Sequence, residues 1–437
     1  MEAFRLIGES IVVLAAILFG VRTGGVAIGL WGGVGATVLV FGFGEALGSP
    51  PIDALLIIIA VILATSTLEA SGGIAWMVSV AARMIVRRPR AVTLVAPLVS
   101  LLFSIGAGTS NILFSLLPVI QEVSVRAGVR PSKPISVSVV ATSIALACSP
   151  VSAAMAAMIA IMDERGDGWS ILQLLAITIP AAVIGVIVTA LLVGRFGGAD
   201  PDRADGADRI DLDSLATVTS ATTRRGRATA LVYLGGVLLI IVFGLFEPLR
   251  PVDTTGEVVG VATMIQLIML VAATLIVLIG RPEISSIPST AIFRGGMVAA
   301  IAFFGLAWMI DTYLSAHADT VEAGLASWVA EWPWAMTIAV FLVAVLTTSQ
   351  STATRMIVPI ALAAGLPIGL VAGLWVGALG GIYLLPTNGL QIAAASFDTT
   401  GSTKLGRRLY DHSFFVPSLL ITAATSLAGA GIGALVA

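Results

Sequence analysis

The chain has 437 residues, 58% of them hydrophobic and only 11% charged, whereas ordinary soluble domains carry about 25% charged residues. Apolar runs long enough to cross a hydrocarbon core of ~30 Å recur along the whole sequence, which predicts an all-α polytopic membrane protein. A net charge of −2 provides no basic field for nucleic acid. The single cysteine, Cys148, excludes an intramolecular disulfide and a multi-cysteine metal site.

In chain order, hydropathy predicts a first half made of spans 7–21, 24–47 and 51–69, an apolar block 91–124, and segments 134–162 and 170–195. The N-terminus has neither a basic n-region nor a clear cleavage site, so we expect the first apolar run to be a retained helix. Residues 197–227 are rich in Asp, Arg, Gly, Ser and Thr and are expected to be a solvated linker between halves 1–196 and 228–437. The second half gives segments 228–246, 258–280, 288–314, 333–364, 367–396 and 413–436.

The short basic loops predict the orientation, because Lys and Arg accumulate on the cytoplasmic side of a membrane. Basic residues flank block 91–124 on both sides, and others lie in the linker and in the loop before the last span: Arg83, Arg87, Arg88, Arg90, Arg126, Arg130, Lys133, Arg224, Arg225, Arg227, Lys404, Arg407 and Arg408. The loops that contain Asp163 and Glu164, and Asp319, Glu322 and Glu331, then fall outside. This assignment places both termini on the outer side, with block 91–124 entered from the cytoplasm and block 333–364 from outside.

Each of these two blocks has a small, polar centre, "GAGTSN" (106–111) in the first and "TTSQSTAT" (347–354) in the second. Each arm has about 15–17 residues, which at 1.5 Å per residue is short for a span. A re-entrant hairpin and two short full crossings are both consistent with the charge pattern. The hairpin is favoured, because unpaired polar backbone at membrane depth is tolerated only beside protein or a water-filled cavity.

The two halves repeat the same pattern. When Pro118 is aligned with Pro359, the polar centres coincide, and the spacing from Pro131 to Pro150 equals that from Pro367 to Pro386. Proline inside an apolar segment removes a backbone hydrogen bond and breaks the helix, so 134–162 and 367–396 are predicted to be broken helices. With opposite orientation the halves form an inverted repeat, each with about five transmembrane helices, one re-entrant hairpin and a broken helix.

Four polar breaks near the membrane centre predict a binding site for a small anion. Half-helices that end there present N–H groups equivalent to about half a positive charge each, and hydroxyl and amide side chains add uncharged donors. The candidates are Ser110, Asn111, Ser149, Ser152, Ser351, Thr354, Thr387 and Asn388, together with Thr109, Gln350 and Thr352. Arg355, the only Lys or Arg between Arg294 and Lys404, can bind a carboxylate with two parallel hydrogen bonds.

Each candidate also has a structural interpretation. The serines, threonines and Asn388 could cap the broken helices, and Arg355 could pair with a carboxylate such as Glu69 or Asp311. Those two acids are themselves candidates for coupling or gating, or else for helix-end contacts. His317 and His412 show no metal-ligand spacing, and no metal or cofactor is expected apart from coupling to Na⁺ or H⁺.

Five motifs, spread over both halves, resemble the Dcu family of anaerobic four-carbon dicarboxylate transporters: "FSLLPVIQEV" (114–123), "CSPVSAA" (148–154), "SQSTATRMIVP" (349–359), "LLPTNG" (384–389) and "FDTTGSTKLGRRLYDHSF" (397–414). Ser110 and Asn111 stand where the family pattern has Gly and His. The resemblance implies exchange or uptake of aspartate, malate, fumarate and succinate across the bacterial inner membrane, and a homodimer by analogy.

The leading functional hypothesis is a secondary transporter that exchanges dicarboxylates by an alternating-access, elevator-like mechanism. The alternative is a sodium- or proton-coupled symporter of a dicarboxylate or another small anion. An intramembrane enzyme is disfavoured, because no His or paired carboxylates at depth could activate a nucleophile. ATP-driven transport is disfavoured because the sequence has no Gly-rich phosphate loop. The expected partners are small dicarboxylates and membrane lipid.

Overall fold

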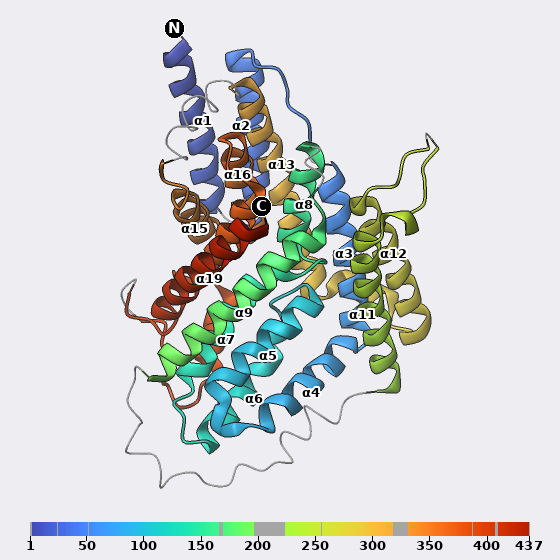
Figure 1. Cartoon of the computed structure of the whole chain (residues 1–437), viewed down its shortest axis with the longest axis vertical. Coiled ribbons are helices and arrows are strands. Elements are labelled where there is room, and N and C mark those ends of the chain that lie inside the picture. The colour runs from blue at the N-terminus through green and yellow to red at the C-terminus, as the bar shows by residue number, and fades with distance from the viewer. Residues whose placement is uncertain are drawn as a thin grey trace.

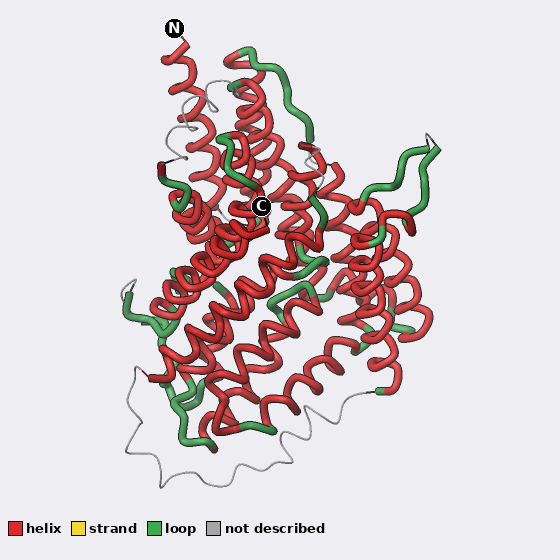
Figure 2. The backbone as a smooth tube through the Cα atoms, viewed as in Figure 1, coloured by secondary structure: helices red, strands yellow, loops and turns green. Residues whose placement is uncertain are grey.

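The computed structural model describes residues 2–23, 25–50, 52–165, 169–195, 223–254, 256–317, 331–386, 388–406 and 410–436. These residues form helices and connecting loops, and within them the only β-pairing is an isolated bridge between Val252 and Val258 (Figure 2). The predicted linker 197–227 lies largely outside the described residues. Its last residues, from Arg224 on, belong to a helix, so the linker ends earlier than predicted.

The first half contains the helices α1 (Glu2–Thr23), α2 (Ala27–Phe43), α3 (Ile52–Ala70), α4 (Gly73–Val86), α5 (Val92–Ala107), α6 (Ile112–Arg126), α7 (Ser132–Ala145), α8 (Ala153–Arg165) and α9 (Ile171–Arg195), with short 3₁₀ turns η1 (Pro89–Ala91) and η2 (Leu146–Cys148). The second half contains α11 (Arg224–Leu245), α12 (Val261–Gly280), α13 (Ala291–Ala316), α15 (Ala335–Thr347), α16 (Gln350–Ala363), α17 (Ile368–Ala378), α18 (Gly389–Phe397) and α19 (Phe415–Val436), with η4 (Glu247–Leu249), η5 (Ile284–Ser289) and η6 (Leu379–Tyr383).

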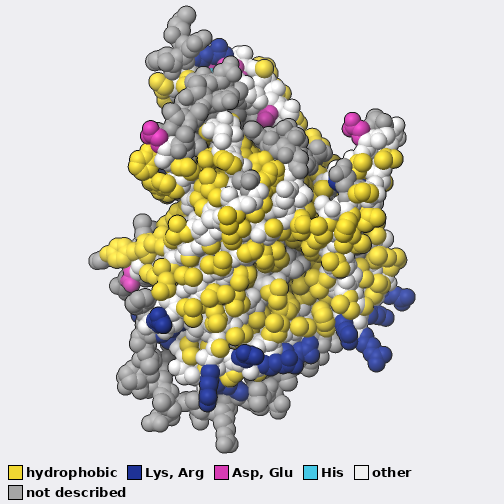
Figure 3. Space-filling model, in the orientation of Figure 1, with side chains coloured by type: hydrophobic (Ala, Val, Ile, Leu, Met, Phe, Trp, Pro, Cys, Tyr) yellow, Lys and Arg dark blue, Asp and Glu magenta, His cyan; other side chains and the backbone are white. Residues whose placement is uncertain are grey.

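The predicted fold class, an all-α polytopic membrane protein, is confirmed. Among the described residues, seven helices are long and apolar enough to cross a membrane, or up to eight if a bent pair counts as one span. On the face drawn in Figure 3, apolar side chains form a broad band, most Lys and Arg side chains lie at its lower end, and Asp and Glu lie chiefly above. This charge distribution is the one expected of a protein oriented across a bilayer.

Among the helices of the described residues, α4 is the one that hydropathy did not predict. It is bent by 74° from α3 and packs against α5, α6 and α11. Met77, Ala81 and Ile85 are buried on one face, whereas Arg83 lies near the end of the helix. At 14 residues the helix is too short to span a bilayer, so a search for long apolar segments does not detect it.

Blocks 91–124 and 333–364 each form a pair of short helices, and the polar centre of each block forms the turn that joins the two helices. Helices α5 and α6 lie in the lower part of the molecule and α15 and α16 in the upper part (Figure 1). Both broken helices are interrupted beside the prolines: α7 and η2 stop before Ser149, and η6 stops before Leu384. The side from which each pair enters the membrane, and the inverted relation of the halves, stay predictions.

Glycines allow two helix pairs to pack backbone against backbone. A Cβ on Gly29 of α2 would overlap the carbonyl of Ile301 in α13, and a Cβ on Gly373 of α17 would overlap the carbonyl of Gly429 in α19. Close contact of this kind is typical of membrane helices, where packing of small residues replaces the hydrophobic driving force. Helices α1, α2 and one face of α13 share an apolar cluster separate from the large core, to which α13 also contributes Phe303.

Candidate functional site

A cavity of about 520 Å³ lies where both helix-pair tips and both breaks meet, within the range of about 300–1,000 Å³ typical of small-molecule sites. One wall is apolar and comes from α2, α3 and α13, for example Ile28, Ile62 and Val298. The other wall comes from the tips and breaks and carries most of the polar groups. The polar side chains that line the cavity are Thr65, Thr109, Ser110, Asn111, Thr347, Thr348, Ser349, Gln350, Ser351, Thr352, Tyr383 and Asn388.

The tip of the first pair connects α5 to α6 through Gly108–Asn111. Gly108 has a left-handed backbone (φ 67), and a Cβ there would lie 2.5 Å from the carbonyl oxygen of Val151. Only glycine therefore allows the tip to contact the break of the first broken helix. The Asn111 N–H donates to Thr109 Oγ1 at 3.2 Å. The structure thus brings Thr109, Ser110 and Asn111, all predicted, to the cavity.

The tip of the second pair presents the N-terminus of α16 to the cavity. Thr348 adopts the left-handed conformation (φ 49), which is uncommon for a residue with a side chain. Ser349 follows as the N-cap, because its Oγ accepts from the Thr352 N–H at 3.3 Å. The predicted residues Ser351 and Thr352 line the cavity with Gln350.

The second break presents the N-terminus of α18 to the same cavity. The Asn388 side chain accepts from the Leu390 N–H at 3.0 Å, and the Asn388 N–H donates to Gln391 Oε1 at 3.2 Å. This reciprocal arrangement is a capping box. Asn388 lines the cavity as predicted, whereas Thr387 lies outside the described residues.

The predicted serines of the first break do not line the cavity. Ser152 is buried, donates to the Leu146 carbonyl and accepts from the Met155 N–H at 3.0 Å, so it caps the start of α8. Ser149 is also buried and accepts from the Val151 N–H at 3.4 Å. Both contacts agree with the structural interpretation, in which these serines cap the broken helix. Apolar residues of this break, among them Val151 and Ala154, line the cavity instead.

Arg355 and Thr354 lie behind the cavity wall. The guanidinium carbon of Arg355 is 4.4 Å from the centre of the Phe303 ring of α13, and the residue is 7% exposed. Thr352 and Ala302, their neighbours along α16 and α13, line the cavity. Thr354 accepts from Trp375 Nε1 at 2.8 Å, a contact that joins α16 to α17. Arg355 is thus next to the cavity without being part of its surface.

Glu69 and Asp311, the candidates for coupling or gating, accept from backbone N–H groups and do not line the cavity, although Ile292, the donor to Glu69, does line it. Glu69 Oε2 accepts from the Ile292 N–H at 3.2 Å, at the start of α13, where a negative charge complements the helix dipole. Asp311 Oδ2 accepts from the Ser49 N–H at 2.7 Å in the connection between α2 and α3. Both contacts agree with the alternative interpretation, in which these acids stabilise the ends of helices.

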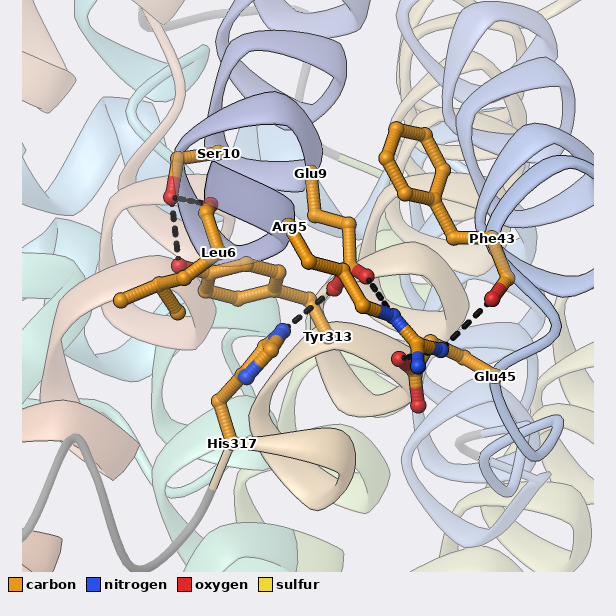
Figure 4. Close-up of polar contacts among 8 residues, drawn as sticks. All are labelled: Arg5, Leu6, Glu9, Ser10, Phe43, Glu45, Tyr313 and His317. Carbon is orange, nitrogen blue, oxygen red and sulfur yellow. Dashed lines mark hydrogen bonds and ion pairs between the residues drawn. The ribbon is translucent and has the colours of Figure 1, made fainter. Parts of the chain in front are cut away.

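A second polar cluster joins the start of α1 to the ends of α2 and α13 (Figure 4). Buried Glu9 accepts from Arg5 Nε at 3.0 Å and pairs with His317, while Arg5 also contacts Glu45 and the Phe43 carbonyl. The cluster offers three ligand atoms, from Glu9, Glu45 and His317, within 4.8 Å of one another. Because Arg5 contacts both carboxylates, the cluster fits a structural tie between helices.

Sequence reasoning missed Thr65, Tyr383 and the residues Thr347–Ser349 as lining residues. The last three lie in the polar run "TTSQSTAT", so the run itself was the signal. Thr65 begins the short polar run Thr65–Thr67 inside the predicted span 51–69, a signal that the sequence reasoning did not use, whereas Tyr383 lies among apolar residues and gives no comparable signal. The Tyr383 hydroxyl is hydrogen-bonded to the side chains of Ser110 and Thr142, so it connects the second broken helix to the first tip and to α7.

Comparison with known proteins agrees with this architecture. The chain matches the family model described as "Anaerobic c4-dicarboxylate membrane transporter" over residues 5–437. DcuB of Escherichia coli O6:H1, an anaerobic C4-dicarboxylate transporter, is 33% identical over 94% of this chain and 95% of its own length. The C4-dicarboxylate transporter DcuA of Wolinella succinogenes is 35% identical over 95% and 96%.

Two solved structures share the fold at low sequence identity. The YdaH transporter of Alcanivorax borkumensis superposes with a TM-score of 0.55 at 16% identity, over 91% of this chain and 87% of that one. MtrF of Neisseria gonorrhoeae gives 0.58 at 13%, over 91% and 83%. The prediction of a membrane transporter, and not an enzyme, is confirmed by the family model and by the relatives. Because the family model matches residues 5–437, the chain belongs to the Dcu family of anaerobic C4-dicarboxylate membrane transporters.

Proposed function

We propose that the chain is a secondary active transporter that exchanges C4-dicarboxylates such as aspartate, fumarate, malate and succinate across the bacterial inner membrane. The family and the names of its relatives support the substrate class. The observation that carries the proposal is the composition of the cavity, where the N-termini of α16 and α18 and a set of hydroxyl and amide groups face one space beside Arg355.

A dicarboxylate has the size and charge that this arrangement can bind. The N-termini of α16 and α18 each provide the equivalent of about half a positive charge, together with N–H donors. One carboxylate fits against these termini and the hydroxyls of Ser351 and Thr352. Arg355 supplies the full positive charge for the second carboxylate, because Thr352 and Arg355 lie one turn apart on α16.

None of the described residues that line the cavity is an Asp, Glu or His. A proton-coupled mechanism would therefore need a titratable group from beyond the cavity surface, whereas exchange of one dianion for another needs none. Sodium coupling is the alternative, because hydroxyl and carbonyl oxygens at the two tips are ligands suited to Na⁺. The coupling ion is decided by the transport assay below.

The contrast between the two walls supports an elevator-like mechanism. Tips and breaks form the polar wall, and α2, α3 and α13 form a mostly apolar wall with little to bind a charged substrate. In this proposal the polar wall carries the substrate past the apolar wall, which serves as the fixed scaffold. Both termini are proposed to lie outside, and the membrane lipid and a second copy of the chain are the proposed partners.

Exchange in proteoliposomes tests the function directly. Vesicles that contain the purified protein and internal succinate should take up labelled aspartate, fumarate or succinate, with much slower uptake into empty vesicles. Exchange that is unchanged when choline replaces sodium, and when the pH gradient is collapsed, supports antiport. Uptake into empty vesicles that requires sodium would instead establish symport, and no exchange of any C4-dicarboxylate would refute the substrate assignment.

A further inference from the structure

The break between η6 and α18 leaves backbone groups that a continuous helix would have paired. In an unbroken helix the Leu384 carbonyl would accept from the Asn388 N–H, four residues on. Pro386 lies between them, and residues 384–386 and 388 are not helical. A buried backbone group without a partner costs about 1–3 kcal/mol, so the break needs other hydrogen-bond partners.

Two side chains supply these partners. His412 Nε2 lies 2.8 Å from the Leu384 carbonyl oxygen, and Gln391 Nε2 donates to the Tyr383 carbonyl at 2.8 Å. Gln391 Oε1 also accepts from the Asn388 N–H at 3.2 Å. His412 and Gln391 therefore replace the helical hydrogen bonds that the break removes. We call these two residues the break clamp.

The geometry around His412 fixes one form of its ring. Nδ1 accepts from the Phe414 N–H at 3.2 Å, and a backbone N–H can only donate, so Nδ1 carries no proton. The Leu384 carbonyl can only accept, so Nε2 carries the proton. The ring is 7% exposed and packs against Phe414 and Phe415. His412 thus connects the break to the start of α19.

Gln391 is completely buried and sets the position of Asn388 from the other side. Its contact with the Tyr383 carbonyl fixes the residue whose hydroxyl binds Ser110 at the first tip. The clamp therefore determines where Asn388, Gly389 and Leu390 face the cavity relative to the first tip. Neither clamp residue lines the cavity itself.

We propose that His412 and Gln391 are positioning residues of the transport site, which hold the second break so that the start of α18 faces the substrate. This inference rests on the proposed dicarboxylate transport. It assigns a role to His412, which lies in the motif "FDTTGSTKLGRRLYDHSF" and which the cavity alone does not explain. A residue of this kind changes substrate affinity more than it changes global stability.

The test compares His412→Leu, which cannot donate, with His412→Gln, whose Nε2 is the same number of bonds from Cβ as that of histidine. In proteoliposome exchange with labelled succinate, KM should rise at least about tenfold in His412→Leu, equivalent to about 1.4 kcal/mol, and return to within about threefold of wild type in His412→Gln. Gln391→Met should raise KM in the same way. His317→Leu is the matched control: it removes the contact with Glu9 and should lower the melting temperature with no change in KM.

A second readout does not depend on transport. A Cβ at Gly389 would meet no atom within 4 Å, so Gly389→Cys places a thiol in the cavity, and the native Cys148 is fully buried. Labelling of that thiol should become severalfold faster when His412→Leu is added, and His412→Gln should restore the slower rate. If wild-type protein exchanges no dicarboxylate, the proposed function fails while the labelling still tests the clamp.

Wild-type KM and wild-type labelling in His412→Leu would overturn the proposal. So would equal KM values in His412→Leu and His412→Gln together with equal losses of melting temperature, because that result describes a purely structural residue. If His412→Leu is not recovered as folded protein, Gln391→Met carries the test, and unchanged KM and labelling in that variant reject the clamp.

Discussion

Replacement of Arg355 tests the proposed charge balance of the site. In Arg355→Ala the guanidinium that lies 4.4 Å from the Phe303 ring is lost, and with it the only full positive charge between Arg294 and Lys404. A unit positive charge about 6–8 Å from a carboxylate attracts it by about 2–3 kcal/mol at an effective dielectric constant of about 20. The expected result is a rise in KM for succinate exchange of at least about tenfold, since tenfold corresponds to about 1.4 kcal/mol.

Two further variants separate charge from geometry. Arg355→Lys keeps the charge but loses the planar fork, so exchange should recover only in part. Phe303→Leu removes the aromatic face that stabilises the guanidinium by about 0.5–2 kcal/mol. That variant should lower the melting temperature and change KM less than Arg355→Ala does. Arg294→Ala, at an exposed position of α13, is the matched control and should behave as wild type.

The measurement is initial exchange of labelled succinate in proteoliposomes, with the melting temperature of each purified variant recorded in detergent. A wild-type KM in folded Arg355→Ala would refute the assignment of Arg355 to the second carboxylate. The assignment is supported if Arg355→Ala loses most of its succinate exchange but exchanges a monocarboxylate analogue as wild type does. In that case only the second carboxylate of the substrate depends on the arginine.

Three other predictions follow from the same geometry. Gly108→Ala should lower the melting temperature and abolish exchange. The left-handed backbone of Gly108 costs about 1–2 kcal/mol when a side chain is present, and the new Cβ would lie 2.5 Å from the Val151 carbonyl oxygen. A wild-type melting temperature would contradict this. Gly295→Phe should block exchange with little loss of stability, because Gly295 lines the cavity and a Cβ there meets no atom within 4 Å; normal exchange would show that substrate passes elsewhere. Burial raises the pKa of Asp398 in the loop after α18, but hydrogen bonds from Thr400, Ser402 and Thr403 outweigh burial and leave that pKa below its usual value. Its contribution to stability is therefore present above the carboxyl's unfolded pKa and is lost as the pH falls through the folded pKa, so Asp398→Asn should lower the melting temperature at neutral pH and show less further loss on acidification.

Much of the fold could be predicted because hydropathy and proline position act locally. Each apolar segment produced a helix near its predicted bounds, and the interruptions at Pro150 and Pro386 follow from the lost N–H of proline. Helix α4 could not be predicted in this way, because its burial depends on contact with α5, α6 and α11. A short helix with one apolar face gives no signal in a search for long spans.

The candidate site was predictable in part, for a related reason. Polar tips must face protein or water, so Ser110, Asn111 and Ser351 could be assigned to a cavity from composition alone. Which way a helix turns its side chains depends on tertiary packing. The repeat aligns Arg355 with Phe114, yet Phe114 lines the cavity and Arg355 packs against Phe303. That Tyr383 lines the cavity could be learned only from the structure.

The position of Arg355 behind the wall has a consequence for exchange. The Phe303 ring stabilises the guanidinium by about 0.5–2 kcal/mol whether or not substrate is bound, so it offsets part of the cost of burying that charge in the empty site. The empty site can then persist between the release of one substrate and the binding of the next, and the substrate is bound by partial charges and one nearby cation without deep trapping. A transporter that must release its substrate on both sides benefits from binding of this moderate strength, because tight binding in one state would slow the release that completes each cycle.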